Sequence, residues 1–370
     1  MAKTILLTGC AGFIGYHSAR TLLERGDRII GIDNLNNYYD PKLKEARLEI
    51  LKKYPGFKFL KQNIEDDINI KEKIDIICHL AAQAGVRYSI ENPFAYEKTN
   101  MLGTLNILEF ARNSGIKSIV FASSSSVYGN AKEVPFKETM KLDEPISLYA
   151  ATKKANELYC HVYFHLFGIN MIGLRFFTVY GTWGRPDMAL FKFTESILAG
   201  KEIEVFNNGN LVRDFTYVDD IVDGVIKSID KLLENDISNV MSDDSKKSEG
   251  ERSIVNSKKG NISNVNGEKS IQSSKRNEES NNNTNNKKIF EIINLGRGQP
   301  IQLMDFIHEI ENATGKTAKL KMLGMQAGDV NQTFADISKA KALLGYNPKT
   351  SVHDGIAKFV DWYKGYYKVK

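Results

Sequence analysis

Short apolar runs alternate with stretches of helical length through the first half of the chain. Six of these runs predict β-strands, namely Ile5–Thr8, Arg28–Asp33, Phe57–Leu60, Ile74–Leu80, Ser118–Ser123 and Met171–Phe177. Strands that are apolar almost throughout, with helices between them, are typical of a parallel sheet covered on both faces. The pattern therefore predicts an α/β fold with a doubly wound parallel sheet.

The pattern after residue 180 is mixed and predicts a smaller α/β lobe. A helix is expected from Leu303 to Thr314, because apolar residues recur there at i, i+3, i+4 and i+7 and Gly315 follows. No internal repeat is found.

Residues 235–288 differ from the rest in composition. This segment is rich in Asn, Ser, Lys and Glu and contains no aromatic residue. Such a composition buries too little apolar area to offset the entropy of ordering, so it predicts a disordered surface insertion. The insertion is either a loop expansion, which adds little closure cost, or an arm that binds an unknown partner.

Composition narrows the protein class. The chain has 370 residues, 42% of them hydrophobic, and a net charge of +5, which does not argue for nucleic acid but suits an anionic substrate. The three cysteines are far apart, which favours a reducing compartment. The histidines lack metal-ligand spacing, so no metal is expected. With no signal peptide and no apolar run of membrane-spanning length, we expect a cytoplasmic protein that does not contact a membrane.

A glycine-rich loop follows the first predicted strand. Gly9, Gly12 and Gly15 precede a helical pattern, as in loops that let the chain approach a pyrophosphate at a helix N-terminus. Asp33 ends the second strand, where a carboxylate can accept hydrogen bonds from ribose hydroxyls and would repel a 2′-phosphate. The small residues after His79 let the chain pass close to a dinucleotide. The motif predicts a Rossmann-type site for NAD rather than NADP.

A second motif suggests catalysis. Tyr149 and Lys153 are spaced i, i+4 on one helical face, after a run of serines that includes Ser124. A nearby ammonium is expected to stabilise the phenolate and to lower the pKa of Tyr149 toward neutrality. The serine hydroxyl can bind the same substrate oxygen. The glycine-rich loop, the serine run and the Tyr–Lys pair follow one another in the order expected of one catalytic site, which argues against an incidental Tyr–Lys pair.

Together these motifs resemble the extended short-chain dehydrogenase/reductases, over almost the whole chain apart from the insertion. The resemblance implies hydride exchange between a retained NAD and a sugar carbon, with Tyr149 as acid and base. It also implies that residues 1–180, with later segments returning, bind NAD and that residues 181–370 mainly bind a nucleotide sugar. A homodimer is implied through helices near residues 103–114 and 149–166.

Several stretches resemble UDP-glucuronate 4-epimerases in particular, above all Trp183 to Ala189. The resemblance implies interconversion of UDP-glucuronate and UDP-galacturonate, with Arg185 at the sugar end, where a guanidinium suits a carboxylate. Ser125 and Ser126 stand where resembling 4,6-dehydratases carry an Asp-Glu pair, which disfavours elimination of water. Asn63, followed by Ile64, stands where relatives often place an aspartate for adenine.

The expected site residues form three sets. The catalytic set is Ser124, Tyr149 and Lys153. The cofactor set is Gly9, Gly12, Phe13, Ile14, Gly15, Asp33, Asn34, Asn36, Asn63, Ile64, Leu80, Ala81, Ala82, Gln83, Asn100, Tyr149, Lys153 and Phe176. The substrate set is Arg87, Ser124, Ser125, Ser126, Tyr149, Thr178, Arg185, Met188, Val205, Phe206, Arg213, Gln326 and Asp329.

Other functions stay open at this point. A UDP-glucuronate decarboxylase would share the fold and first step, and a 4-epimerase could instead act on neutral or N-acetylated UDP-hexoses. A redox-sensing protein that binds NAD without catalysis is the alternative of a different class, but it need not keep Ser124, Tyr149 and Lys153 together. Each arginine of the substrate set could instead be a surface salt-bridge partner.

Overall fold

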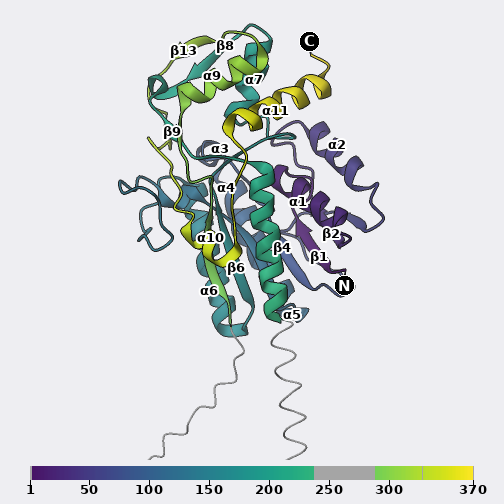
Figure 1. Ribbon diagram of the computed structural model, residues 1–370. Coiled ribbons are helices and arrows are strands. Elements are labelled where there is room, and N and C mark those ends of the chain that lie inside the picture. The colour runs from purple at the N-terminus through teal and green to yellow at the C-terminus, as the bar shows by residue number, and fades with distance from the viewer. Residues whose placement is uncertain (1, 237–287, 327, 370) are drawn as a thin grey trace, which may run out of the picture. The chain divides into compact units, whose positions relative to one another are not determined.

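The computed structural model of the protein describes residues 2–236, 288–326 and 328–369 (Figure 1). Residues up to 233 and from 289 onward form one compact unit. The predicted insertion lies outside the described residues, apart from residues 235, 236 and 288. In the described part, no helix is long and apolar enough to cross a bilayer.

A seven-stranded sheet forms the centre of this unit. Its strands, in spatial order, are β11 (Phe290–Leu295), β6 (Asn170–Phe176), β5 (Ser118–Ser124), β4 (Ile76–His79), β1 (Thr4–Thr8), β2 (Arg28–Asp33) and β3 (Phe57–Lys61). Every neighbouring pair is parallel. The predicted α/β fold is confirmed, and the six predicted strands lie within two residues of the observed ones.

Helices pack on both faces of the sheet. The helices of the sheet domain are α1 (Phe13–Glu24), α2 (Pro41–Leu51), α3 (Tyr88–Glu91), α4 (Pro93–Tyr96), the π-helix η1 (Glu97–Leu102), α5 (Gly103–Asn113), the 3₁₀-helix η2 (Ser125–Tyr128), α6 (Leu148–Phe167), a helix over residues 218–236 and α10 (Ser338–Leu344). The smaller lobe contains α7 (Ala189–Leu198), the 3₁₀-helix η3 (Phe206–Gly209), α9 (Leu303–Thr314) and α11 (Val352–Tyr367).

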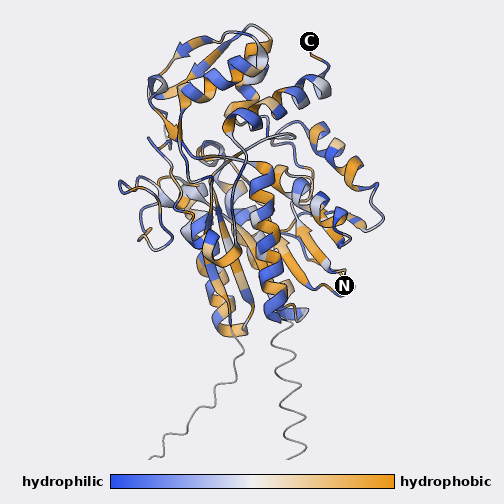
Figure 2. Cartoon of the chain, viewed as in Figure 1, coloured by the Kyte–Doolittle hydropathy of each residue, from blue (hydrophilic) through white to orange (hydrophobic). Residues whose placement is uncertain are grey.

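Alternation along β1 decides which helices meet which face. Leu7 joins the apolar cluster that contains Tyr16 of α1, whereas Leu6 joins the cluster that contains Ile107 of α5 and Cys160 of α6. Successive side chains of a strand point to opposite faces, so a strand of apolar residues buries both. The colouring of Figure 2 shows the central strands as largely hydrophobic.

The later segments build a smaller mixed lobe, seen at the top of Figure 1. It contains the parallel pair β8 (Glu202–Val205) and β13 (Lys319–Met322) with α7, α9 and α11. Two further strand pairs link it to the main sheet: β7 (Thr178–Tyr180) with β10 (Phe215–Tyr217), and β9 (Val212–Arg213) with β12 (Ile301–Gln302). The predicted helix α9 is confirmed, and Gly315 ends it with φ of 71°.

The strand order positions a site. The chain runs outward from β1 to β3 on one side and from β4 to β6 on the other, so the winding reverses between β1 and β4. In open parallel sheets, ligands bind beyond the carboxyl ends of the strands at such a reversal. The glycine-rich loop follows β1, and Leu80 and Ala81 follow β4 at this point.

Candidate active site

The glycine-rich loop leaves no room for side chains. Gly9 has φ of +75°, and a Cβ there would lie 2.9 Å from the backbone nitrogen of Ala81. A Cβ on Gly15 would lie 2.0 Å from the carbonyl oxygen of Gly9. The loop therefore passes directly against the chain that follows β4.

Helix α1 opens toward this loop. Its hydrogen bonding begins with Tyr16 N donating to the Gly12 carbonyl at 2.9 Å, and no side chain of the described residues caps it. The N–H groups of Phe13 and Ile14, both expected in the cofactor set, therefore stay available to an anion. A helix N-terminus with free donors favours a pyrophosphate there.

Asp33 is buried at the end of β2. Its Oδ2 accepts from Ala11 N at 3.0 Å and its Oδ1 from Leu35 N at 2.9 Å. A carboxylate has about four acceptor directions, so each oxygen can still accept a ribose hydroxyl. Together with the glycine-rich loop, this geometry fits a dinucleotide.

The asparagines of the cofactor set form local bonds. Asn34 Nδ2 donates to Asn63 Oδ1 at 3.1 Å, which leaves the Asn63 carbonyl one further acceptor direction. Asn36 Oδ1 accepts from Lys44 Nζ at 2.6 Å. Asn100 is buried, and its side chain bonds to the backbone of Gln83. The Asn100 side chain therefore fixes the backbone of the segment that follows β4.

The hydrophobic members of the cofactor set differ in burial. Ile64 and Phe176 are buried, and a Cβ on Gly103 would lie 2.7 Å from the Ile64 side chain. They set the shape of the wall behind the loops rather than exposing a polar group. Leu80 and Ala82 lie, partly exposed, in the segment after β4.

Tyr149 and Lys153 lie in the first two turns of α6. Ser147 caps this helix by accepting from Ala150 N at 3.2 Å. Lys153 is buried, its Nζ donates to the Ala122 carbonyl at 2.8 Å, and burial lowers its pKa to about 8. Ser124 is buried at the end of β5, and its Oγ accepts from Ser126 N at 3.1 Å.

One expectation about Tyr149 was wrong. Burial raises the pKa of its phenol, because the phenolate is desolvated, while a hydrogen bond with Ser124 and the charge of Arg185 lower it in part. The Lys153 ammonium does not contribute to this shift and binds the Ala122 carbonyl instead. Ser124 and Arg185 therefore lower the pKa of Tyr149 by less than desolvation raises it.

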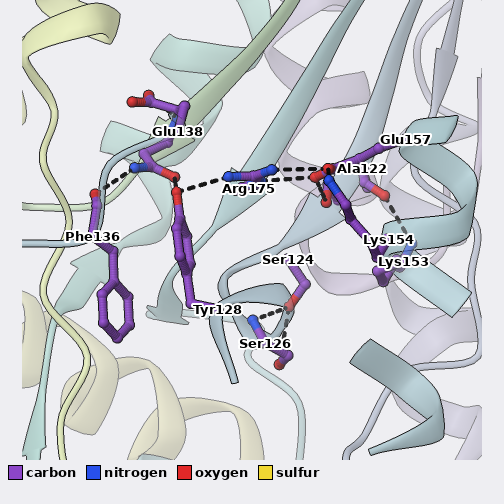
Figure 3. A network of polar contacts seen from close by, with 12 residues as sticks. Ala122, Ser124, Ser126, Tyr128, Phe136, Glu138, Lys153, Lys154, Glu157 and Arg175 are labelled. Carbon is purple, nitrogen blue, oxygen red and sulfur yellow. Dashed lines mark hydrogen bonds and ion pairs between the residues drawn. The ribbon is translucent and has the colours of Figure 1, made fainter. Parts of the chain in front are cut away.

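A buried ion pair beside the serine strand was missed in the sequence (Figure 3). Arg175 on β6 donates through Nε and Nη2 to the two carboxylate oxygens of Glu157, at 2.8 and 2.9 Å. Glu157 also accepts from Ser123 Oγ at 2.7 Å, and Arg175 Nη1 donates to the Tyr128 phenol. The pair ties α6, β5 and β6 together next to Ser124.

At the sugar end that the resemblance implies, Arg185 is already paired. Its Nε and Nη2 donate to the carboxylate of Asp187 at 3.0 and 2.5 Å, and the phenol of Tyr38 donates to the same carboxylate at 3.0 Å. Sequence reasoning missed both partners. Arg185 remains near enough to Tyr149 to lower its pKa in part.

A pocket beside Arg185 gathers several expected residues. It is lined by Phe13, Thr178, Val179, Tyr180, Gly181, Gly184, Arg185, Met188, Ala189, Leu190, Phe191, Phe215 and Phe359. Phe13 comes from the cofactor loop, whereas Thr178, Arg185 and Met188 belong to the substrate set. The fold therefore brings members of both sets to one pocket.

A second cluster gathers other members of the substrate set. Asp329 lies between Arg87, at 3.4 Å, and Arg213, at 4.0 Å, and the Arg87 guanidinium lies 4.8 Å from the centre of the Phe206 ring. Burial lowers the pKa of Arg213. Gln326 has a buried side-chain oxygen without a partner in the described residues, and Val205 is buried in the core. Two cations share one carboxylate here, which suits an incoming anion.

Comparison with known proteins agrees with this geometry. The profile of the NAD dependent epimerase/dehydratase family matches residues 5–241. The chain belongs to this family. Its cofactor is therefore NAD, and the resemblance to the extended short-chain dehydrogenase/reductases is confirmed.

Relatives extend along almost the whole chain. An uncharacterized protein of Methanocaldococcus jannaschii is 48% identical, covering 98% of this chain and 96% of its own. A probable UDP-glucuronate 4-epimerase of Rhizobium meliloti is 40% identical, covering 98% and 97%. The crystal structure of a Bacillus cereus UDP-glucuronic acid 4-epimerase with UDP-glucuronic acid and NAD is 31% identical, with a TM-score of 0.79, covering 98% of this chain and 100% of that one.

Proposed function

We propose that this enzyme, an NAD-dependent UDP-sugar 4-epimerase, converts UDP-glucuronate to UDP-galacturonate and back. One observation carries the choice of a uronic acid: Arg185, which keeps N–H donors that Asp187 does not engage, lies close enough to Tyr149 for its charge to act on that phenol. A carboxylate on C5 of the sugar would find its cation beside the acid/base. The relatives named for UDP-glucuronate support the same choice.

The chemistry that NAD supplies when bound is reversible hydride exchange with C4 of the sugar. Tyr149 accepts the proton of the C4 hydroxyl and later returns it, and Ser124 steadies the C4 oxygen through its hydroxyl. Lys153, whose ammonium is buried and has a pKa of about 8, would hold the cofactor ribose when NAD is bound. The 4-keto sugar turns about its bond to the diphosphate and presents its other face.

The phenolate that this cycle needs is not favoured by the protein alone, since burial raises the pKa of Tyr149. The hydrogen bond with Ser124 and the charge of Arg185 offset part of that rise. Both groups already act on Tyr149 in the unliganded protein, where desolvation outweighs them. We therefore infer that Tyr149 becomes an effective base only when bound ligands add to their effect.

A uronic acid introduces a hazard, because its 4-keto form is a β-keto acid that can lose carbon dioxide. Hydrogen bonds from Ser125, Ser126, Thr178 and Arg185 would hold the carboxylate out of the plane that favours this loss. Arg185 has five N–H donors, of which Asp187 engages two. The remaining donors can bind the substrate without breaking the pair with Asp187.

In the proposed division of labour, residues 1–180 and the returning β11 supply the NAD site, and the segments after residue 180 mainly supply the nucleotide-sugar site. Arg213, with Arg87 beside it, would bind the diphosphate end, and the loop that carries Gln326 and Asp329 would contact the nucleotide. Two cations around one carboxylate support this role, because a single negative charge does not neutralise both.

The deciding experiment is incubation of the purified protein with UDP-glucuronate, without added NAD, followed by product identification. We expect UDP-galacturonate. A UDP-pentose would instead indicate a decarboxylase, activity on UDP-glucose alone would indicate a UDP-hexose 4-epimerase, and NAD binding without turnover of either sugar would indicate a sensor.

Arg185→Ala tests the role of the guanidinium. We expect a raised KM for UDP-glucuronate and more pentose per galacturonate. Arg28→Ala, at an exposed side chain that begins β2, is the matched control. If the Arg185 variant kept the rate, the affinity and the product ratio of the wild type, the carboxylate role would be wrong.

We further propose a homodimer through α5 and α6. Leu105 on α5 and Leu158, Val162 and Leu166 on α6 are exposed apolar side chains, and Leu166 is 63% exposed. An apolar strip along two adjacent helices favours a self-complementary interface. We expect twice the monomer mass in light scattering, and a shift to monomer for Leu158→Glu with Val162→Glu; a wild-type monomer at micromolar concentration contradicts the proposal.

A further inference from the structure

Arg47 on α2 is an arginine with none of its surface exposed. Its Nη1 donates to the Ala11 carbonyl at 2.8 Å and to the Tyr39 phenol at 2.9 Å. Its Nη2 donates to the Trp183 carbonyl at 2.5 Å and to the Gly184 carbonyl at 3.4 Å. One guanidinium thus joins the glycine-rich loop to the loop that leads into Arg185.

The charge of Arg47 has no acidic partner in the described part of the chain, where all four of its acceptors are neutral oxygens. Its Nε also has no partner there. A buried charge is costly unless it is compensated, and burial leaves its field poorly screened. A pyrophosphate at the start of α1, next to Ala11, would supply the missing negative charge.

At the loop that leads into Arg185, Arg47 binds a residue whose backbone conformation is unfavourable. Trp183 has φ of +58°, which is rare for a residue with a large side chain. Its indole packs 5.6 Å from the ring of Tyr16 and 5.3 Å from that of Trp362, while Arg47 binds its carbonyl. The backbone immediately before Arg185 is therefore fixed from both sides, and one of those sides is Arg47.

We propose that Arg47 is a positioning residue that couples the two halves of the site. Its hydrogen bonds hold the cofactor loop and the sugar loop in one arrangement, and its charge favours the pyrophosphate of NAD. Filling the nucleotide-sugar side would hold Trp183 and Gly184, whose carbonyls Arg47 already binds, more firmly in this arrangement and thereby strengthen the retention of NAD. By linkage, NAD strengthens binding on the sugar side by the same factor.

The proposal rests on the UDP-sugar function but not on the identity of the sugar, so UDP is the probe. The full-length protein is purified, its NAD content is measured after denaturation, and the rate of NAD release is followed with and without UDP. In the wild type we expect UDP to slow the release of NAD severalfold. A UDP-glucuronate assay on the same samples reports separately on the uronic acid.

Two variants separate geometry from charge. Arg47→Lys keeps the charge but loses the planar guanidinium that binds both loops at once. We expect the effect of UDP on NAD release to fall to less than twofold. Arg47→Gln also loses the charge, and we expect the dissociation constant for NAD to rise about tenfold to a hundredfold, as for lost hydrogen bonds of a charged group. Arg25→Lys is the matched control and should behave as the wild type.

A purely structural role would lower the urea midpoint of the variants and leave the effect of UDP on NAD release intact, which would overturn the proposal. Wild-type behaviour of Arg47→Lys would also overturn it. If neither variant folds, the wild-type measurement decides alone: NAD release that is indifferent to UDP refutes the coupling.

Discussion

Breaking the buried pair of Glu157 and Arg175 should be costly. Glu157 accepts from Ser123 Oγ at 2.7 Å, from Arg175 at 2.8 and 2.9 Å and from Lys154 Nζ at 3.2 Å. The two side chains of the pair are 4% and 2% exposed. Glu157→Gln keeps the volume but leaves the Arg175 cation without a counter-ion. We expect the free energy of unfolding to fall by about 3–5 kcal/mol.

The assay is urea unfolding followed by tryptophan fluorescence. The double variant Glu157→Gln with Arg175→Met removes both charges, and it should be less destabilised than the sum of the two single variants by about 1–3 kcal/mol. Glu49→Gln breaks the exposed pair with Lys52 and should cost no more than about 1 kcal/mol. The reasoning is refuted if Glu157→Gln costs no more than this control, or if the two single effects are additive.

Three further predictions concern the cofactor, pH and the sugar end. Asp33→Ser removes the carboxylate that binds Ala11 N and Leu35 N, so NAD content should fall and the preference for NAD over NADP should shrink in titrations with both; unchanged preference would contradict the ribose role. Burial lowers the pKa of His17 and His79 from 6.5 to about 3. The fold therefore holds both rings neutral while the unfolded chain takes up protons, so stability is present above pH 6.5 and is lost as the pH falls toward 3. At pH 5.5 the loss should be about 1.4 kcal/mol for each ring, measured as a shift of the urea midpoint from its value at pH 7.5, and His79→Gln should reduce that shift. Asp187→Asn frees the guanidinium of Arg185 from its carboxylate, so KM for UDP-glucuronate should rise and more pentose should form per turnover; an unchanged product ratio would show that Asp187 does not position Arg185.

The central sheet was predictable because its strands are apolar on both faces and end at glycines or polar residues. The strand β11 was not predicted, although Phe290–Leu295 is partly apolar. It lies directly after the compositionally distinct segment and pairs with β6, which precedes it by more than a hundred residues. Nothing local indicates such a partner.

The geometry of the candidate site was predictable where one short segment forms it, as with Gly9 to Gly15 or Tyr149 and Lys153. It was not predictable where the geometry depends on distant partners. Asp187 and Tyr38 meet only in the folded chain. The sequence contains one indication that Arg47 is buried, because Arg47 lies among Leu43, Leu48 and Leu51 on the buried face of α2. The pKa of Tyr149 also escaped prediction, since spacing along a helix does not report burial.

The late position of β11 has a consequence for synthesis of the protein on the ribosome. The outer edge of β6 receives its partner only when residues 290–295 have been made, because Met171 to Phe176 pair with Phe290 to Leu295. Until then the nascent chain carries an unsatisfied strand edge, which is a template for wrong pairing with other chains. A transcript truncated before residue 290 should therefore yield aggregates rather than a free nucleotide-binding half, and chaperones should engage the chain during this interval.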